Sequence, residues 1–177
     1  MNQLTPILHR WDVRGLAAIF GLDSRRRIAR LLPWVSRSAD GPAYPLVLAF
    51  LLVWDPPAGR QLLLAGLFAF ALELSAYRLL KQAVKRRRPF ETLPQIACRR
   101  RPADRFSFPS GHTAAAFVMA ALLGRFCPVL APAAGLWAAA VGLSRVYLGV
   151  HFPSDVVGGM ILGSVSAVCG IAATVML

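Results

Sequence analysis

Five long apolar runs dominate this sequence and limit what it can fold into. They cover residues 42–54, 59–80, 110–127, 128–148 and 155–177. Crossing the hydrocarbon layer takes about 20 residues of helix, so the last four runs are long enough and the first is short. Hydrophobic residues make up 56% of the 177-residue chain, which is too apolar for a soluble protein of this size. The sequence therefore predicts an all-α, polytopic transmembrane helix bundle of about five spans, the first of them tilted or locally thinning the bilayer.

The first 40 residues differ from the rest because charged side chains interrupt every apolar stretch. Apolar residues recur there at helical spacing among arginines, which is typical of a helix that lies in the membrane surface. The same interruptions exclude the uniform apolar core of a cleavable signal peptide. We expect residues 1–40 to form an interfacial amphipathic helical segment, with one or two helices within 4–37, and residues 41–177 to form the transmembrane domain.

The chain is strongly basic, with a formal net charge of +12. In a soluble protein this balance would suggest nucleic-acid binding. Here the cations flank the apolar runs, which favours contacts with lipid headgroups and phosphate, so we expect no nucleic-acid partner. Cys98, Cys127 and Cys169 have neither the spacing of a disulfide framework nor that of a zinc site, and we interpret them as small apolar fillers.

Three polar strings lie at the ends of the apolar runs. They are Lys81-x6-Arg88-Pro89, Pro109-Ser110-Gly111-His112 and Ser144-Arg145-x5-His151-x3-Asp155. Because consecutive spans alternate in direction, the end of the second, the start of the third, the end of the fourth and the start of the fifth share one membrane face. The sequence predicts that the three strings meet there, under the polar loop between residues 86 and 109.

The side chains of these strings suit phosphoryl transfer. Three cations can stabilise the charge that spreads over the equatorial oxygens of a phosphoryl group. A helix that begins after Ser110 points its backbone N–H groups at an anion, and Gly111 lets the backbone come close to a ligand. The Asp155 carboxylate can accept a hydrogen bond from one nitrogen of His151, which fixes the tautomer and leaves the other nitrogen free to attack.

The three strings closely resemble the three-part signature of the type 2 phosphatidic acid phosphatase (PAP2) superfamily, over about residues 60–165. That superfamily includes membrane lipid phosphate phosphatases, undecaprenyl pyrophosphate phosphatases, glucose-6-phosphatase and vanadium haloperoxidases. The resemblance implies a phosphatase that needs no metal or other cofactor, with residues 41–177 as the phosphatase domain. It also implies that His151 is the nucleophile and forms a transient phosphohistidine, that His112 is the general acid and that Asp155 orients His151. The implied phosphate-binding residues are Lys81, Arg88, Ser110, Gly111 and Arg145.

A site embedded in a membrane favours a lipid substrate that enters between the helices. We favour a polyprenyl (undecaprenyl-type) phosphate or pyrophosphate, with phosphatidate or phosphatidylglycerophosphate as the alternative. A soluble phosphate ester, haloperoxidase-like vanadate chemistry and a catalytically silent lipid-phosphate-binding protein are competing interpretations. The intact His112, His151 and Asp155 argue against the silent protein, and the number of spans argues against the haloperoxidases. The headgroup, the choice between mono- and pyrophosphate, and the oligomeric state stay open.

The distribution of charge predicts an orientation in the bacterial inner membrane. In the predicted five-span topology, all Lys and Arg residues except Arg60 and Arg125 lie on the same side of the membrane as the three strings. The positive-inside rule then places the active site at the cytoplasmic face. We interpret Lys85, Arg86 and Arg87 as side chains that extend to the membrane interface rather than as phosphate ligands.

Two further features carry weaker predictions. Glu73 is the one acid inside an apolar run, where an ionisable group is costly, and it could pair with Arg78 or a hydroxyl of the bundle. We leave its role open. Small residues recur every four positions in the last two runs, which predicts close packing of the fourth span against the fifth. These rows are Ala131, Gly135 and Ala139, and Gly159, Gly163 and Ala167.

Overall fold

The computed structural model describes residues 4–21 and 26–175, and every regular element within them is helical. The helices are α1 (Leu4–Phe20), α2 (Arg26–Ser38), α3 (Ala43–Trp54), α4 (Pro56–Val84), α5 (Pro89–Thr92), α6 (Gly111–Phe126), α7 (Ala131–Tyr147) and α8 (Pro153–Val175), with a 3₁₀ turn, η2 (Pro128–Leu130), before α7. The predicted all-α bundle is confirmed. A helix occurs in each of the five apolar runs.

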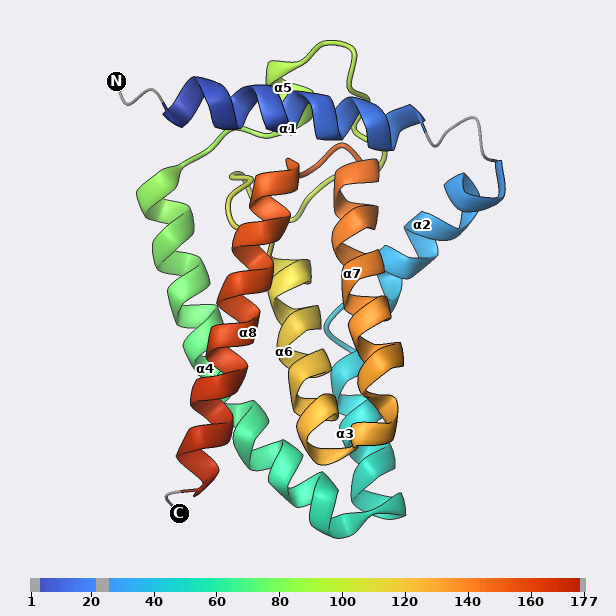
Figure 1. Ribbon diagram of the computed structural model, residues 1–177, viewed down its shortest axis with the longest axis vertical. Helices are drawn as coiled ribbons and strands as arrows, with labels where there is room; N and C mark the ends of the chain where they lie inside the picture. The colour runs from blue at the N-terminus through green and yellow to red at the C-terminus, as the bar shows by residue number, and fades with distance from the viewer. Residues whose placement is uncertain (1–3, 22–25, 176–177) are drawn as a thin grey trace.

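Helices α4, α6, α7 and α8 run side by side, and α3 lies beside the beginning of α4 (Figure 1). Within residues 4–21 and 26–175, three segments are long and apolar enough to cross a membrane, namely Pro56–Thr92, Pro128–Tyr147 and Pro153–Thr174. The helix α3 is apolar but has only 12 residues, and α6 has 16. Packed against α4, α7 and α8, α6 is mostly buried, and its Ala114, Ala116 and Val118 are fully enclosed.

The small residues of α8 pack against α6 and α4. A Cβ atom at Gly163 would lie 2.2 Å from the carbonyl oxygen of Ala114, and one at Gly170 would lie 2.4 Å from that of Ala65. At Gly135 of α7, by contrast, an added Cβ would meet nothing within 4 Å. The prediction that the small residues join the fourth span to the fifth is therefore wrong. A repeated small residue indicates close approach between helices but does not say which helix approaches.

The N-terminal segment forms two helices, as its amphipathic pattern predicts. Figure 1 shows α1 lying across the end of the bundle where α7 stops and α8 starts. Its Leu16 is fully buried, and a Cβ at Gly15 would lie 3.0 Å from the Pro153 side chain. The helix α2 packs on α7 with Leu32 buried, while its Trp34 is exposed. Each helix thus packs one face against the bundle, and its other face exposes apolar side chains such as Trp11 and Trp34.

The loop between α5 and α6 covers the same end of the bundle. Ile96 joins a buried cluster with Leu16 of α1 and Phe152, next to the start of α8. The guanidinium of Arg99 lies over the ring of Phe20, 4.4 Å from its centroid, and over that of Tyr147, 4.2 Å from its centroid. These contacts fix the loop above the ends of α4 and α7 and the beginnings of α6 and α8.

Candidate active site

The side chains of the first string, Lys81 and Arg88, converge on one carboxylate. Lys81 lies in the last turn of α4 and is 7% exposed, and Arg88 precedes α5 and is 1% exposed. Lys81 Nζ contacts Oδ2 of Asp104, and Arg88 Nη2 contacts Oδ1 of the same residue. Asp104 belongs to the covering loop and lies outside the three strings. The two proposed phosphate ligands therefore hold an oxyanion that the chain itself supplies.

Backbone carbonyls hold the Arg88 guanidinium in place. Its Nη1 donates to the carbonyl oxygen of Val150 over 2.7 Å, and its Nη2 donates to that of Phe106 over 2.9 Å. Because Val150 directly precedes His151, these bonds join the first string to the third. They also leave Arg88 little freedom to move when a ligand arrives.

Tyr77 is a further member of this cluster, and no sequence pattern predicts it. Its hydroxyl donates to Asp104 Oδ2, and Lys81 Nζ lies 4.7 Å from the centroid of its ring. A Cβ at Gly111 would come within 2.8 Å of Tyr77 Cε2, so only glycine allows the ring to lie against the start of α6. Gly111 thus does permit a close approach, but its neighbour in the structure is Tyr77.

Asp104 is held as a carboxylate. Burial raises its pKa, but hydrogen bonds from Lys81 and Tyr77 and the charge of Arg88 outweigh burial and bring the pKa below its ordinary value. The cluster therefore binds a negatively charged oxygen pair, as a phosphate site must.

The second string begins α6 in an unusual way. Ser110 occupies the N-cap position, as predicted, but its side chain caps no backbone N–H. Its Oγ instead accepts a hydrogen bond from Thr113 Oγ1 over 2.9 Å, and its N–H donates to the carbonyl of Asp155 over 3.0 Å. The first-turn N–H groups of α6 therefore lack the usual side-chain acceptor, and the positive end of the helix dipole is left for an anion.

His112 pairs with a second loop carboxylate. Its Nε2 lies 3.0 Å from Oδ1 of Asp40, whose Oδ2 accepts a hydrogen bond from Arg100 over 2.9 Å. Burial raises the pKa of Asp40, but the bonds to Arg100 and His112 outweigh it and lower the pKa. The His112 side chain is 33% exposed, so it remains accessible from outside the bundle.

Arg145 lies in the last turn of α7 and is 4% exposed. Its Nη1 donates to Ser36 Oγ of α2 over 2.8 Å. Its Nε is buried and has no partner in the part of the chain that the structure describes. The Arg100 guanidinium also contacts Ser36, at 3.5 Å, and it donates to Asp40 as well. Arg100 therefore links the partner of Arg145 to the carboxylate that pairs with His112.

His151 is 3% exposed and lies between Arg88 and the start of α8. Its Nδ1 is 3.8 Å from Asp155 Oδ2, which is too long for a hydrogen bond, and has no other partner within residues 4–21 and 26–175. The hydrogen bond that the sequence predicts is therefore not formed, although Oδ2 of Asp155 is on the Nδ1 side of the ring. Burial lowers the pKa of His151 to about 4, against the charge of Asp155, so the ring is neutral at pH 7.

The interpretation of Arg86 from the sequence is wrong. Arg86 does not extend to the membrane interface: its Nη1 donates to Asp155 Oδ1 over 2.7 Å and to Ser154 Oγ over 2.6 Å. Lys85 and Arg87 are exposed, in agreement with the interpretation. Glu73 is 5% exposed, and no ion pair joins it to Arg78 in the described chain.

Comparison with known proteins agrees with this arrangement. The family model described as PAP2 superfamily matches residues 62–176. Decaprenylphosphoryl-5-phosphoribose phosphatase of Mycobacterium tuberculosis is 38% identical over 109 residues, which cover 62% of this chain and 59% of that protein. Phosphatidylglycerophosphatase B of Bacillus subtilis is 38% identical over 108 residues, which cover 55% of this chain and 50% of that one. The chain thus covers only 50–59% of the length of these two relatives.

A solved structure shares nearly the whole fold. The crystal structure of a transmembrane PAP2-type phosphatidylglycerolphosphate phosphatase from Bacillus subtilis superposes with a TM-score of 0.75 at 25% identity. The match covers 97% of this chain and 88% of that chain, so it includes the N-terminal helices. The convergence of the three strings, the family match and the shared fold lead to one conclusion: this chain belongs to the PAP2 superfamily.

Proposed function

We propose that this protein is an integral-membrane phosphatase that hydrolyses a phosphate monoester or pyrophosphate of a membrane lipid through a phosphohistidine on His151. One observation carries the proposal: Lys81, Arg88 and Tyr77 bind the oxyanion of Asp104, and Arg88 ties this cluster to the backbone beside a buried, neutral imidazole. An oxyanion cradle beside an uncharged nucleophile is what in-line phosphoryl transfer requires.

The reaction then follows in two steps. The lipid phosphate replaces Asp104 on Lys81 and Arg88, and Nε2 of His151 attacks phosphorus, since Nδ1 faces Asp155. The bond from phosphorus to the leaving oxygen breaks, and His112 gives that oxygen its proton. Water then attacks the phosphohistidine, passing a proton to His112, and inorganic phosphate leaves as His151 is restored.

Arg145 and the start of α6 complete the phosphate site in this proposal. Arg145 supplies the third cation from α7. The backbone N–H groups in the first turn of α6, which starts at Gly111 after Ser110, donate to the remaining phosphate oxygens. No metal has a part in these steps, because Lys and Arg neutralise the developing charge.

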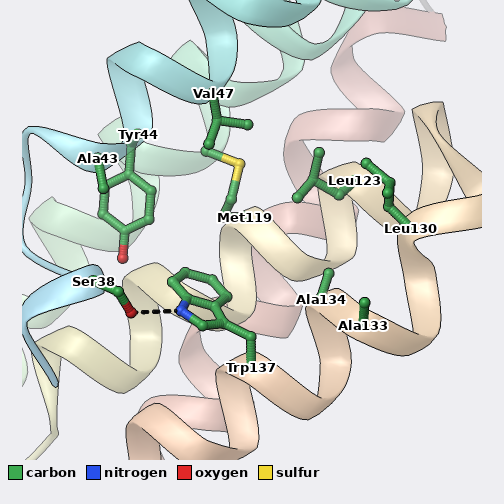
Figure 2. Close-up of a pocket in the computed structure, with 10 residues that line it drawn as sticks. All are labelled: Ser38, Ala43, Tyr44, Val47, Met119, Leu123, Leu130, Ala133, Ala134 and Trp137. Carbon is green, nitrogen blue, oxygen red and sulfur yellow. Dashed lines mark hydrogen bonds between the residues drawn. The ribbon is translucent and has the colours of Figure 1, made fainter. Parts of the chain in front are cut away.

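The lipid chain has a place close to this site. An apolar cavity of about 340 Å³ lies between α3, α6 and α7, with Tyr44 and Trp137 together near Ser38 and with Leu123 and Leu130 away from them (Figure 2). A second, of about 390 Å³, shares Tyr44 and Met119 and extends along α3 and α4. The indole N–H of Trp137 donates to Ser38, two residues before the Asp40 that pairs with His112. The first cavity is thus lined by Ser38, close in the chain to the partner of the proposed general acid.

We propose a polyprenyl phosphate or pyrophosphate as the substrate, with phosphatidate or phosphatidylglycerophosphate as the second candidate. The first is supported by the relative whose name specifies a decaprenylphosphoryl compound, and the second by the phosphatidylglycerophosphatase. The apolar cavities suit either kind of chain.

A phosphate-release panel on purified protein tests the function. The panel contains isoprenoid pyrophosphates, isoprenoid monophosphates and glycerophospholipids, each with excess chelator and each with vanadate. We expect hydrolysis to survive the chelator and to stop with vanadate, which occupies the phosphate site. Strict dependence on magnesium, or binding of every lipid without turnover, would contradict the proposal, and the latter would favour the silent lipid-binding protein.

Replacing Asp104 by asparagine should strengthen substrate binding. Asn keeps the size of the side chain but removes the charge that competes with phosphate for Lys81 and Arg88. We expect KM to fall about tenfold, the equivalent of one charge-assisted hydrogen bond, and vanadate to inhibit at lower concentration. Asp55→Asn, which removes a carboxylate at the other end of α4, is the control. A rise in KM would mean that Asp104 organises the site rather than occupying it.

We further propose that the site faces the cytoplasm. The arginines of α1 and α2, such as Arg14 and Arg37, support this orientation, since both helices lie at the end of the bundle where the three strings meet. Cys98 is exposed in the covering loop and offers a test. In a variant with the other two cysteines replaced by alanine, an impermeant thiol reagent should label Cys98 in permeabilised cells only. Equal labelling of intact cells would place the site outside.

A further inference from the structure

Asp12 is a buried carboxylate on a helix that otherwise lies on the surface. It belongs to α1 and is 1% exposed, whereas Trp11 beside it is 67% exposed. Its Oδ1 accepts the backbone N–H of Ser154 over 2.8 Å, and its Oδ2 accepts the Ser154 hydroxyl over 2.6 Å. Asp12 thus acts from another helix on the first turn of α8, which contains Asp155.

Arg86 connects Asp12 to Asp155. Its Nη2 donates to Asp12 Oδ2 over 2.5 Å, and its Nη1 donates to Asp155 Oδ1 over 2.7 Å. The Cζ atom of Arg86 also lies over the Phe152 ring, 4.2 Å from its centroid. A guanidinium that holds two carboxylates through two different nitrogens fixes their relative position, because its donors have a rigid geometry.

The bridge controls the direction in which Asp155 points. Arg86 holds Oδ1, and the backbone N–H of Phe152 donates to Oδ2 over 2.7 Å. Both oxygens are thereby fixed, and Oδ2 is the one that faces His151 Nδ1. Without Arg86, Oδ1 would be a fully buried carboxylate oxygen with no charged partner, and the carboxylate would turn or take up a proton.

We propose that Asp12 and Arg86 are positioning residues for the phosphoryl transfer: through Ser154 they hold the Asp155 carboxylate in place beside Nδ1 of His151, so α1 contributes to the active site. The inference rests on the proposed function of His151. It assigns to the N-terminal helix a role in the reaction itself, in addition to any contact with the membrane surface.

The proposal predicts that loss of Asp12 or Arg86 lowers kcat and leaves KM nearly unchanged. In the described part of the chain, the ion pairs of Asp12 and Arg86 are separate from those that join Asp104 to Lys81 and Arg88, so binding of the phosphate should change little. Loss of orientation at the nucleophile should lower kcat by about 100-fold, the scale of a misplacement of about 1 Å. Arg86→Lys should lose nearly as much as Arg86→Gln, since one ammonium cannot span both carboxylates.

A double-mutant cycle tests the bridge. We compare Asp12→Asn, Arg86→Gln and the double variant in detergent or lipid vesicles, measuring kcat, KM and thermal unfolding. Asp12→Asn should lower kcat strongly in the wild-type background and hardly at all in Arg86→Gln, since the bridge is already broken there. The matched control is Arg87→Gln, which removes an exposed arginine one position along the chain and should leave kcat unchanged.

The state of His151 can also be followed without turnover. The chain has 3 histidines, so ¹⁵N-labelled His151 can be assigned in NMR spectra by single substitutions. We expect its ring signals to shift in Asp12→Asn and in Arg86→Gln but not in Arg87→Gln. This measurement distinguishes the two proposals, because a wild-type protein without phosphatase activity would overturn the function while the spectra still report on the bridge. Independent, additive losses in the cycle, or unchanged His151 signals in both variants, would overturn the bridge.

Discussion

Replacing His151 by alanine should abolish phosphate release from every lipid substrate in the panel. In the proposed mechanism the variant lacks the nucleophile, so no phosphohistidine can form and the cations alone must act on water. Removal of one member of a catalytic unit commonly costs on the order of 10⁴–10⁶ in kcat. The measurement is the initial rate of phosphate release by purified protein, at substrate concentrations well above KM.

His9→Ala is the matched control for this variant. His9 is exposed on α1, and its ring meets that of Phe152 edge-on at a centroid distance of 6.2 Å. Its loss should leave the rate within a few-fold of the wild type. Residual turnover of His151→Ala at a tenth of the wild-type rate would show that another group attacks phosphorus.

Replacing His112 by alanine should impair poor leaving groups far more than good ones. A lipid alkoxide needs a proton as its bond to phosphorus breaks, whereas an activated aryl phosphate leaves without one. General acid catalysis contributes about 10²–10⁴-fold, so we expect a loss of that size on a lipid monophosphate and a much smaller loss on a nitrophenyl ester. Comparing kcat/KM for the two substrates in wild type and variant gives the answer.

The position of His112 makes Asp40→Asn the informative companion to this variant. Asp40 Oδ1 lies 3.0 Å from His112 Nε2, within hydrogen-bond distance, and so can orient the ring. Its loss should produce a weaker form of the same leaving-group dependence. If His112→Ala slows both substrates equally, His112 binds the phosphate and is not the acid.

Much of the architecture is predictable from the sequence because membrane helices are marked by long apolar runs. The five runs correspond to α3, α4, α6, α7 and α8, and alternation of their directions is enough to bring Lys81, Ser110 and Arg145 to one end of the bundle. Helix ends are less well marked. The run 110–127 contains a helix of 16 residues, since Pro128 starts a separate 3₁₀ turn.

The carboxylates around the site could not be placed from the sequence. Asp12, Asp40 and Asp104 belong to no string, and each finds its partner far along the chain, as the bond between Asp12 and Ser154 shows. Such pairings arise from tertiary packing, which local periodicity does not encode. The available signal was the small number of acids. The chain has 8 acids against 20 cations, so an acid on the same side of the membrane as the three strings is more often paired with a cation than free.

The partner of Arg86 could not be predicted from the sequence either. Four consecutive cations precede Pro89, and nothing in their spacing tells which of them turn inward. The structure buries Arg88 and directs Arg86 to Asp155, while Arg87 between them is exposed. Alternation of direction along an extended segment explains this pattern, because neighbouring side chains of extended backbone point to opposite sides.

The most direct test of the mechanism is to trap the phosphorylated enzyme. Protein is mixed with lipid substrate labelled at the transferred phosphate, quenched in alkali within the first turnover and digested, because a phosphoramidate bond is stable in alkali and labile in acid. We predict acid-labile label on the peptide that contains His151 in the wild-type protein, and none in His151→Ala. Label on another residue, or full turnover without any labelled protein at the earliest times, would contradict the mechanism.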